Sequence, residues 1–500
     1  MTLQQLLKQL QYIRFSQDPP VLLAFGLTPL KKSDFIAVHE ASLDILMNQG
    51  VRVDSRRAAD IYGRGRGISV VEMHEKDKTF YQVRFSARSI NDALRTVPYS
   101  FDIFDGNGNK VATLGKDKTK CGIGVTNNNY LDPITHESTP FSLKNMTDIA
   151  RLGNELDFQF ISTPGFIHDI PPNQSELYGL LEMLANTDKP LVLLKEDHKQ
   201  FKEFLDLVEL IRGPQKGKPS ILPYFNPVSP LWMNADTCEK MLDTIERGIP
   251  FIFSNYPLVG SQTPYETELA LILMNAEILA GVALSQLTKK GTEIMLGSLP
   301  SYMPMKVGEK EGYQPESFKL AYASTQILKY YGIPTMTTSG AGRGWGGASG
   351  LGMINYVMNH MIAYLGNAAL VPYTGSPFGS DAGSPSEIVL NNEIINMIER
   401  MISPFDFRDL TRRWKPYSKV QPGKNYLAIR EGVKALRANP PYSNEKLFPN
   451  LSYTRWVEAG RPNPDKLLDI YTAELMAGLK EPEFYKARKD IGEAFIRTVF

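Results

Sequence analysis

The sequence predicts an α/β protein: a (β/α)8 TIM barrel with an α+β N-terminal domain and a mostly helical C-terminal extension. Eight short β-prone runs alternate with helical patterns between residues 116 and 404, and such alternation is typical of a parallel sheet. Eight units favour closure into a barrel, and an open doubly wound sheet is the alternative. We expect an N-terminal domain at 1–115, a catalytic barrel at 116–404 and a helical extension at 405–500.

The N-terminal domain mixes helix and strand signals. Ser33-Asp34 can cap a helix whose apolar residues recur at helical spacing, and Gly50 ends that helix. Further elements follow as strands at 51–53 and 80–85, a helix at 87–97 and a turn at 105–109. The first 15 residues form an amphipathic pattern without the cleavage site of a signal peptide.

The barrel strands are expected to be short and rich in β-branched and aromatic residues. They lie at Cys121–Thr126, Phe158–Thr163, Leu191–Leu194, Ser220–Phe225, Phe251–Ser254, Ile294–Ser298, Pro334–Thr338 and Ala369–Tyr373. Helical patterns follow them at Leu143–Leu156, Gln174–Asn186, His198–Ile211, Asn234–Glu246, Pro264–Leu287, Pro315–Tyr331, Ser349–Leu365 and Ser384–Met401. Beyond residue 404, three helical segments are expected to pack on the barrel or on a second subunit.

Composition excludes several classes of function. The net charge of +1 gives no support for nucleic acid or an anionic membrane as a partner, since either demands a basic excess. No apolar run approaches the ~20 residues of a membrane span. Cys121 and Cys238 are the only cysteines, so no disulfide framework is expected and the setting is cytoplasmic.

The motifs of common cofactor and nucleophile sites are weak or missing. None of the six His pairs with another His or a Cys at a metal-ligand spacing, so no metal site is expected. Gly342–Gly347 matches the dinucleotide-binding glycine pattern but lacks the acidic residue about twenty positions on. No serine sits in a nucleophile elbow. Lys195, just past a strand, is the one candidate for an aldolase-type Schiff base.

The loops after the strands instead carry aromatic and amide side chains, and in a barrel those loops hold the chemistry. Faces of Tyr and Trp attract cations and can cage a quaternary ammonium group, although any single ring can equally be a core residue. The aromatic candidates are Tyr130, Phe225, Tyr256, Tyr302, Tyr313, Trp345, Tyr373 and Phe378. Glu316, Asp381 and Glu387 could balance a cation, and Arg343 could hold a carboxylate.

Many segments spread in order along the chain resemble the trimethylamine methyltransferase family. They are His39–Leu46 with Gly50–Val53, Ala185–Pro190, Asn226–Leu231, Arg247–Pro250, Asn275–Gly281, Gly297–Ser301, Tyr330–Pro334 and Ser386–Ile394. The resemblance implies a barrel that presents a methylated amine to the Co(I) of a separate corrinoid protein. It implies no tightly bound cofactor, because the corrinoid (cobalamin) belongs to the partner. A small amine substrate, the cognate corrinoid protein and a homo-oligomer are the expected partners.

The chain departs from the common family pattern at Gly340–Gly347 and near Glu431-Gly432, and it shows no pyrrolysine. Because trimethylamine activity is associated with pyrrolysine in the family, a quaternary amine such as glycine betaine is the preferred substrate. A relative that only binds an amine or docks the corrinoid protein is the alternative.

Each substrate-binding candidate has an expected role. We expect Tyr256, Trp345 and Tyr373 as cage walls, Asp381 as counter-charge, and Arg343 as the anchor for a substrate carboxylate. Asn226 and Ser298 would orient the substrate. The alternative for Ser298 is a loop serine whose hydrogen bonds serve only the structure. The remaining aromatic candidates for this site are Tyr130, Tyr302 and Tyr313.

Overall fold

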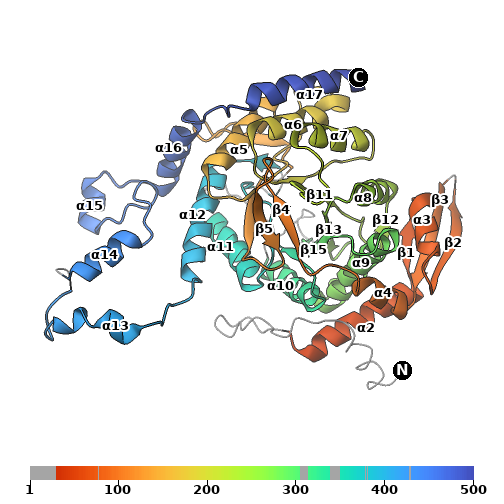
Figure 1. Ribbon diagram of the computed structural model, residues 1–500, viewed down its shortest axis with the longest axis horizontal. Coiled ribbons are helices and arrows are strands. Elements are labelled where there is room, and N and C mark those ends of the chain that lie inside the picture. Colours follow the sequence, from red (N-terminus) through yellow and green to blue (C-terminus); the bar gives the residue numbers. More distant parts are fainter. Residues whose placement is uncertain are drawn as a thin grey trace.

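Eight parallel strands close into a barrel in the computed structural model of this protein (Figure 1), which describes residues 30–500 except 77, 125, 304–313, 338–349, 378, 380, 427 and 428. The strands follow one another around the barrel in chain order, and β18 pairs with β6 to close it. They are β6 (Lys120–Ile123), β9 (Phe160–Ser162), β10 (Leu191–Leu193), β11 (Ile221–Phe225), β13 (Phe251–Asn255), β15 (Ile294–Ser298), β17 (Thr335–Thr337) and β18 (Leu370–Val371). The predicted barrel is confirmed, and each strand falls at one of the eight predicted runs.

A ring of helices covers the barrel (Figure 1), and all eight predicted barrel helices are present. They are α5 (Leu143–Glu155), α6 (Pro172–Asn186), α7 (Phe201–Arg212), α8 (Ala235–Arg247), α9 (Thr267–Thr288), α10 (Pro315–Tyr330), α11 (Gly350–Leu365) and α12 (Pro385–Met401). Several ends are fixed by local chemistry. The Ser142 hydroxyl accepts from the Asn145 amide at the start of α5, and Gly248 ends α8 with φ of 69°.

Alternation along the strands divides the barrel side chains into two cores. One set points inward and packs around Leu222, Ile252, Met295 and Met336. The other set points outward and packs against the helices. A hairpin of β4 (Phe101–Phe104) and β5 (Lys110–Leu114) contributes to the inner core, so it closes the barrel at the amino ends of the strands.

The N-terminal sheet has the order β12-β1-β3-β2 and takes in one short strand, β12, from a loop of the barrel. Strand β1 (Val51–Val53) pairs antiparallel with β3 (Lys78–Phe85) and parallel with β12 (Trp232–Met233), which belongs to the loop after β11. Strand β2 (Ile68–Glu75) was not predicted, because it is a largely exposed edge strand without a regular apolar alternation.

Three N-terminal helices pack against the barrel helix α9. These are α2 (Lys32–Asn48), α3 (Arg56–Gly63) and α4 (Ala87–Leu94). The predicted start of α2 is off by two residues: Lys31 is the N-cap, and Asp34 accepts a hydrogen bond from the Lys31 amide at 2.7 Å.

The prediction that no segment is long and apolar enough for a membrane span is wrong for helix α9. Its 22 residues meet that test by length and composition, yet most of the apolar stretch is buried. The reason is its position, since the barrel covers one side and α2, α3 and α4 cover the other. A helix that is apolar all round is expected in such a central place.

The C-terminal extension returns to the barrel in two helices. Helix α16 (Pro464–Ala477) packs on α12 and α5, and α17 (Tyr485–Val499) packs on α6 and α7. Between α12 and α16 the chain makes a long excursion away from the barrel (Figure 1), which contains α13 (Leu410–Trp414), α14 (Arg430–Ala438) and α15 (Tyr453–Glu458).

Helix α9 and strand β13 pack so closely that adding a single methyl group between them should destabilise the fold. A Cβ at Gly281 would lie 2.1 Å from the Phe253 ring, so Gly281→Ala should lower the free energy of unfolding by about 1–3 kcal/mol. Gly63→Ala is the matched control, because a Cβ there meets its nearest atom at 3.8 Å. Urea unfolding followed by circular dichroism measures both, and equal midpoints for the two variants would contradict this packing.

Candidate active site

Neutral polar and aromatic groups line the inside of the barrel at the carboxyl ends of its strands. The amide of Asn226 donates to the Tyr224 hydroxyl at 2.9 Å and to the Ser254 carbonyl at 3.0 Å. The rings of Tyr224 and Tyr373 meet edge to face with centroids 5.5 Å apart. Two tyrosines from opposite sides of the barrel are thereby joined to the predicted orienting residue Asn226, and we call Tyr224, Asn226, Ser254 and Tyr373 the inner tyrosine cluster.

Burial dominates the chemistry of this cluster. It raises the pKa of Tyr224, and it raises the pKa of Tyr373 well above the usual value, with Tyr224 adding to the effect. Both phenols therefore stay protonated and neutral. Their rings keep their attraction for a cation without contributing a charge of their own.

Tyr224 is a site residue that the sequence reasoning missed. It lies within a predicted strand, Ser220–Phe225, and was not among the predicted aromatic candidates. The neighbouring aromatic Phe225 was predicted for the mouth but faces outward, where it packs on Phe201 and Phe251. Strand alternation requires that one of two adjacent aromatic residues points into the barrel, but it does not show which one.

Tyr256 extends the inner tyrosine cluster toward solvent. It follows β13 on the same strand face as Ile252 and Ser254, and it is close enough to Tyr224 to raise the pKa of that phenol further. Its side chain is 46% exposed, and its hydroxyl accepts from the Ser301 hydroxyl at 3.3 Å. Of the three predicted cage walls, Tyr256 and Tyr373 thus both lie beside Tyr224.

Tyr302, Tyr130 and Asp381 belong to two other groups at this end of the barrel. Tyr302 lies on β16 (Ser301–Tyr302), where it packs edge to face on Tyr265 and shares a hydrogen bond with Thr267 at 2.9 Å. Tyr130 lies on β7 (Asn129–Leu131), which pairs with β19 (Ala382–Gly383). The Asp381 carbonyl accepts from the Asn129 amide at 3.0 Å, and the Asp381 side chain is exposed.

Ser298 does not lie in the inner tyrosine cluster. It pairs with Asn255 and Thr337 on the outward face of its strand, the face that carries Leu296. Its hydroxyl is buried and has no hydrogen-bond partner among the described residues. The strand period of two decides this placement, because the inward position is held by Gly297 opposite Ser254.

Several predicted site residues lie outside the described part of the chain. These are Tyr313, Arg343, Trp345 and Phe378, together with the Gly342–Gly347 motif. The amphipathic pattern of the first 15 residues also lies there.

A buried carboxylate fixes the loop that carries Asn226. Glu277 of α9 accepts hydrogen bonds from the Ser229 hydroxyl at 2.9 Å, the Leu231 amide at 2.8 Å and the Asn255 side-chain amide at 2.8 Å. Burial raises the pKa of Glu277 to about 7, although these hydrogen bonds lower it in part. Glu277 therefore holds the β11 loop against α9 and sets the position of Asn226.

The remaining acidic candidates differ in their surroundings. Glu316 is exposed on the first turn of α10. Glu387 is fully buried on the first turn of α12, where burial raises its pKa to about 7 against a hydrogen bond from Tyr356. Neither carboxylate is in contact with the inner tyrosine cluster in any described interaction.

Two alternative chemistries find no support in the described residues. Lys195, the aldolase candidate, is buried and forms ion pairs with Glu176 and with Asp197, the latter at 3.1 Å. Both carboxylates would have to release it before its amine could attack a carbonyl. Among the described residues, no group of three or more His, Cys, Asp or Glu side chains is placed to hold a metal ion.

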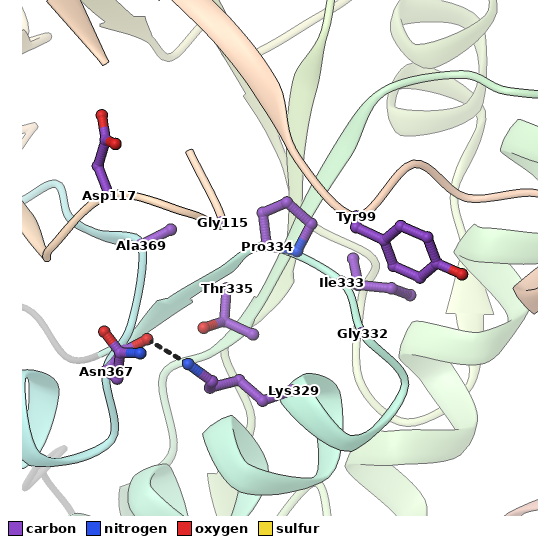
Figure 2. Close-up of a pocket in the computed structure, with 10 residues that line it drawn as sticks. All are labelled: Tyr99, Gly115, Asp117, Lys329, Gly332, Ile333, Pro334, Thr335, Asn367 and Ala369. Carbon is purple, nitrogen blue, oxygen red and sulfur yellow. Dashed lines mark hydrogen bonds between the residues drawn. The ribbon is translucent and has the colours of Figure 1, made fainter. Parts of the chain in front are cut away.

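A pocket of about 460 Å³ opens at the opposite end of the barrel, beside the amino ends of β17 and β18 (Figure 2). Lys329 crosses it to donate to the Asn367 carbonyl at 2.8 Å, and Tyr99 stands at its edge. Conserved chemistry in β/α barrels lies at the carboxyl ends of the strands, whereas this end serves stability. The pocket is therefore not the candidate active site.

Comparison with known proteins identifies the family. Residues 19–498 match the family described as Trimethylamine methyltransferase (MTTB). The trimethylamine methyltransferase MttB of Methanosarcina barkeri is 24% identical over 437 residues, which cover 85% of each chain. A glycine betaine methyltransferase of Desulfitobacterium hafniense is 23% identical over 431 residues, covering 84% of this chain and 86% of the relative.

The fold is also that of a solved methyltransferase. The monomethylamine methyltransferase (MtmB) of Methanosarcina barkeri superimposes with a TM-score of 0.51 at 10% identity, over 98% of this chain and 94% of that one. The barrel and the family match together define the class as a β/α-barrel methyltransferase. Within that class, the chain belongs to the trimethylamine methyltransferase family, as the family match over nearly its full length shows.

Glu387 gives this protein a pH dependence of stability. Its folded pKa of about 7 lies above the ordinary 4.5, so the folded state binds the proton more tightly and loses stability as pH rises through that interval. Glu387→Gln removes this loss and should be more stable than the parent at pH 8, by on the order of 3 kcal/mol, and nearly equal to it at pH 5. Urea midpoints measure both values.

Glu316→Gln is the control, because that side chain is exposed. It should leave the pH profile of the urea midpoint unchanged. A Glu387→Gln protein that is less stable than the parent at pH 8 would show that the carboxylate is stabilised by its surroundings.

Proposed function

We propose that this protein moves a methyl group from a quaternary amine, such as glycine betaine, to the Co(I) of a cognate corrinoid protein. The observation that supports this most strongly is the inner tyrosine cluster, a neutral surface of tyrosine rings and amide groups at the catalytic end of the barrel. Such a surface attracts a cation by its ring faces while offering it no proton. Glycine betaine methyltransferase activity in one relative agrees with a quaternary substrate.

The reaction needs no acid on the protein. The corrinoid supplies an electron pair that forms a bond to the methyl carbon, the carbon–nitrogen bond breaks, and its electron pair stays on nitrogen. A quaternary ammonium therefore leaves as a neutral tertiary amine, whereas a tertiary or secondary amine would need a proton on its nitrogen. The cluster's Tyr224 and Tyr373, kept neutral by burial, match the requirement of the quaternary substrate.

The residues of this chain would bind and aim the substrate. Tyr256 and Tyr373 form walls of the cage together with Tyr224, and Asn226 orients the substrate from the loop that Glu277 holds. Asp381, exposed at the same end of the barrel, supplies a counter-charge. Trp345 as a third wall and Arg343 as a carboxylate anchor stay predictions from the sequence. Correct placement of the methyl group is the main source of rate in such a reaction.

The direct test mixes the protein, a Co(I) corrinoid protein and a panel of methylated amines, and follows the absorbance of methyl-Co(III). Quaternary amines should give the signal and tertiary amines should not. A panel in which no quaternary amine reacts would end this proposal. Thermal-shift binding of an amine without methylation of cobalt would favour the alternative of a binding protein.

Tyr256→Leu tests the cage with little risk to folding, because 46% of the Tyr256 side chain is exposed. Loss of one ring face should weaken the apparent affinity for the ammonium substrate by about 5- to 30-fold, corresponding to ~1–2 kcal/mol of cation–π attraction. Initial rates of cobalt methylation against substrate concentration measure this change.

The matched control is Tyr99→Leu, a tyrosine of nearly equal exposure (45%) at the opposite end of the barrel. Its apparent affinity should equal that of the parent. An affinity that falls alike in both variants, or in neither, would remove Tyr256 from the cage.

A further inference from the structure

A long arm leaves the barrel after α12 and returns beside it. We define the arm as residues 405–439, which include α13 and α14, and Figure 1 shows these helices away from the barrel. The Arg400 side chain donates to the Pro440 carbonyl at 2.6 Å, so the two ends of the arm meet at its base. Beyond that base, Tyr442 contacts Glu393 and Leu447 is buried again.

No described side chain of the arm is buried, although the arm is rich in large apolar residues. At least half of the surface is exposed in each of Phe405, Leu410, Trp414 and Leu436, and Phe407 is 71% exposed. In α14, Val433 and Leu436 stand three residues apart and so share one face of the helix. The nine residues of α14 are fewer than the ~12–15 that an isolated helix needs in water.

The arm has only a small cluster of its own. Trp414 stacks on Tyr417 with ring centroids 5.9 Å apart, and both rings meet Tyr426. This contact links α13 to the segment before α14. It leaves the apolar face of α14 uncovered, so ordering of the arm requires a surface outside it.

Helix α11 offers an uncharged, exposed apolar stripe on the barrel. Ile354, Val357 and Met358 follow the helical spacing of one face, and Ile354 is 55% exposed. The whole helix, Gly350–Leu365, contains no Lys, Arg, Asp or Glu. An exposed helix in a globular protein ordinarily carries charged residues on its outer face, so this stripe has the character of an interface.

The arm and the rest of the chain carry net charges of opposite sign. The arm carries nine Lys and Arg against three Asp and Glu, a net charge of +6. The rest of the chain carries 46 Lys and Arg against 51 Asp and Glu, a net charge of −5. A basic arm on an acidic body attracts the body of an identical molecule, which steers the two together.

We propose that the arm of one copy packs on helix α11 of a second copy of this chain, with Val433 and Leu436 against the stripe of Ile354, Val357 and Met358. Each side then covers an apolar face that its own chain leaves exposed. If the exchange is reciprocal, two such contacts form a symmetric pair, because a two-fold axis uses every contact twice. The proposal does not depend on which substrate the barrel binds.

Cross-linking between two variants, each with one introduced cysteine, tests the contact. Val433→Cys and Ile354→Cys are purified separately, mixed, and treated with a short bis-maleimide. The native Cys121 and Cys238 are buried, so they do not compete for the reagent. The mixture should give a species of twice the 56.1 kDa chain mass. Val433→Cys mixed with Leu210→Cys is the control, because Leu210 is 48% exposed on α7, away from α11, and should give none.

The mass in solution gives an independent measurement by light scattering after size-exclusion chromatography. The parent and Leu210→Asp should have a multiple of the chain mass, and Leu436→Asp should fall to 56.1 kDa with an unchanged circular dichroism spectrum. A parent protein of single-chain mass would overturn the proposal. So would a multimer that survives Leu436→Asp, a Val433→Cys and Ile354→Cys mixture that gives no cross-linked species, or binding of the arm only to the corrinoid protein.

Discussion

The two-residue period of a β-strand is the constraint on which the rest of this molecule depends. In a closed barrel of parallel strands, every second side chain faces an interior filled by packed side chains. Tyr224, Ser254 and Tyr373 lie on that side and form a neutral surface. The alternate positions, such as Asn255, face the helices and bond to Glu277. This alternation therefore separates the candidate binding surface from the contacts that hold the helical shell.

The helical shell in turn fixes the loops. Glu277 is a buried carboxyl in the middle of a largely apolar helix, and it accepts two hydrogen bonds from the loop after β11 and one from Asn255 at the end of β13. Since α9 is itself covered by the N-terminal helices, this link extends from the outermost layer to the inner tyrosine cluster. The N-terminal part is thus a structural support for the catalytic end of the barrel, and the family match spans both.

The order of strands and helices could be predicted from the sequence, because each barrel unit repeats the same short apolar run and amphipathic helix. The direction of individual side chains could not. Buried parallel strands are apolar on both faces, so nothing in the letters separates inward Tyr224 from outward Phe225, or inward Gly297 from outward Ser298. Strand β12 was also beyond prediction, since its partner β1 is distant in the chain. Strand β2 pairs locally with β3, but it is largely exposed and lacks a regular apolar alternation. Tyr256, Tyr373 and Asn226 could be predicted as candidates from their residue type and their position at or just after the end of a predicted strand.

The pairing of β12 with β1 also affects how the chain can be made. During synthesis, the ribosome releases β1, β2 and β3 long before Trp232 and Met233 leave the exit tunnel. Until then β1 is an open edge with unpaired backbone groups, and such edges recruit strands from other molecules. Nascent chains of this protein therefore carry a vulnerable surface through nearly a third of translation. A chaperone that shields that edge would act on the newborn polypeptide and have no role once β12 has docked.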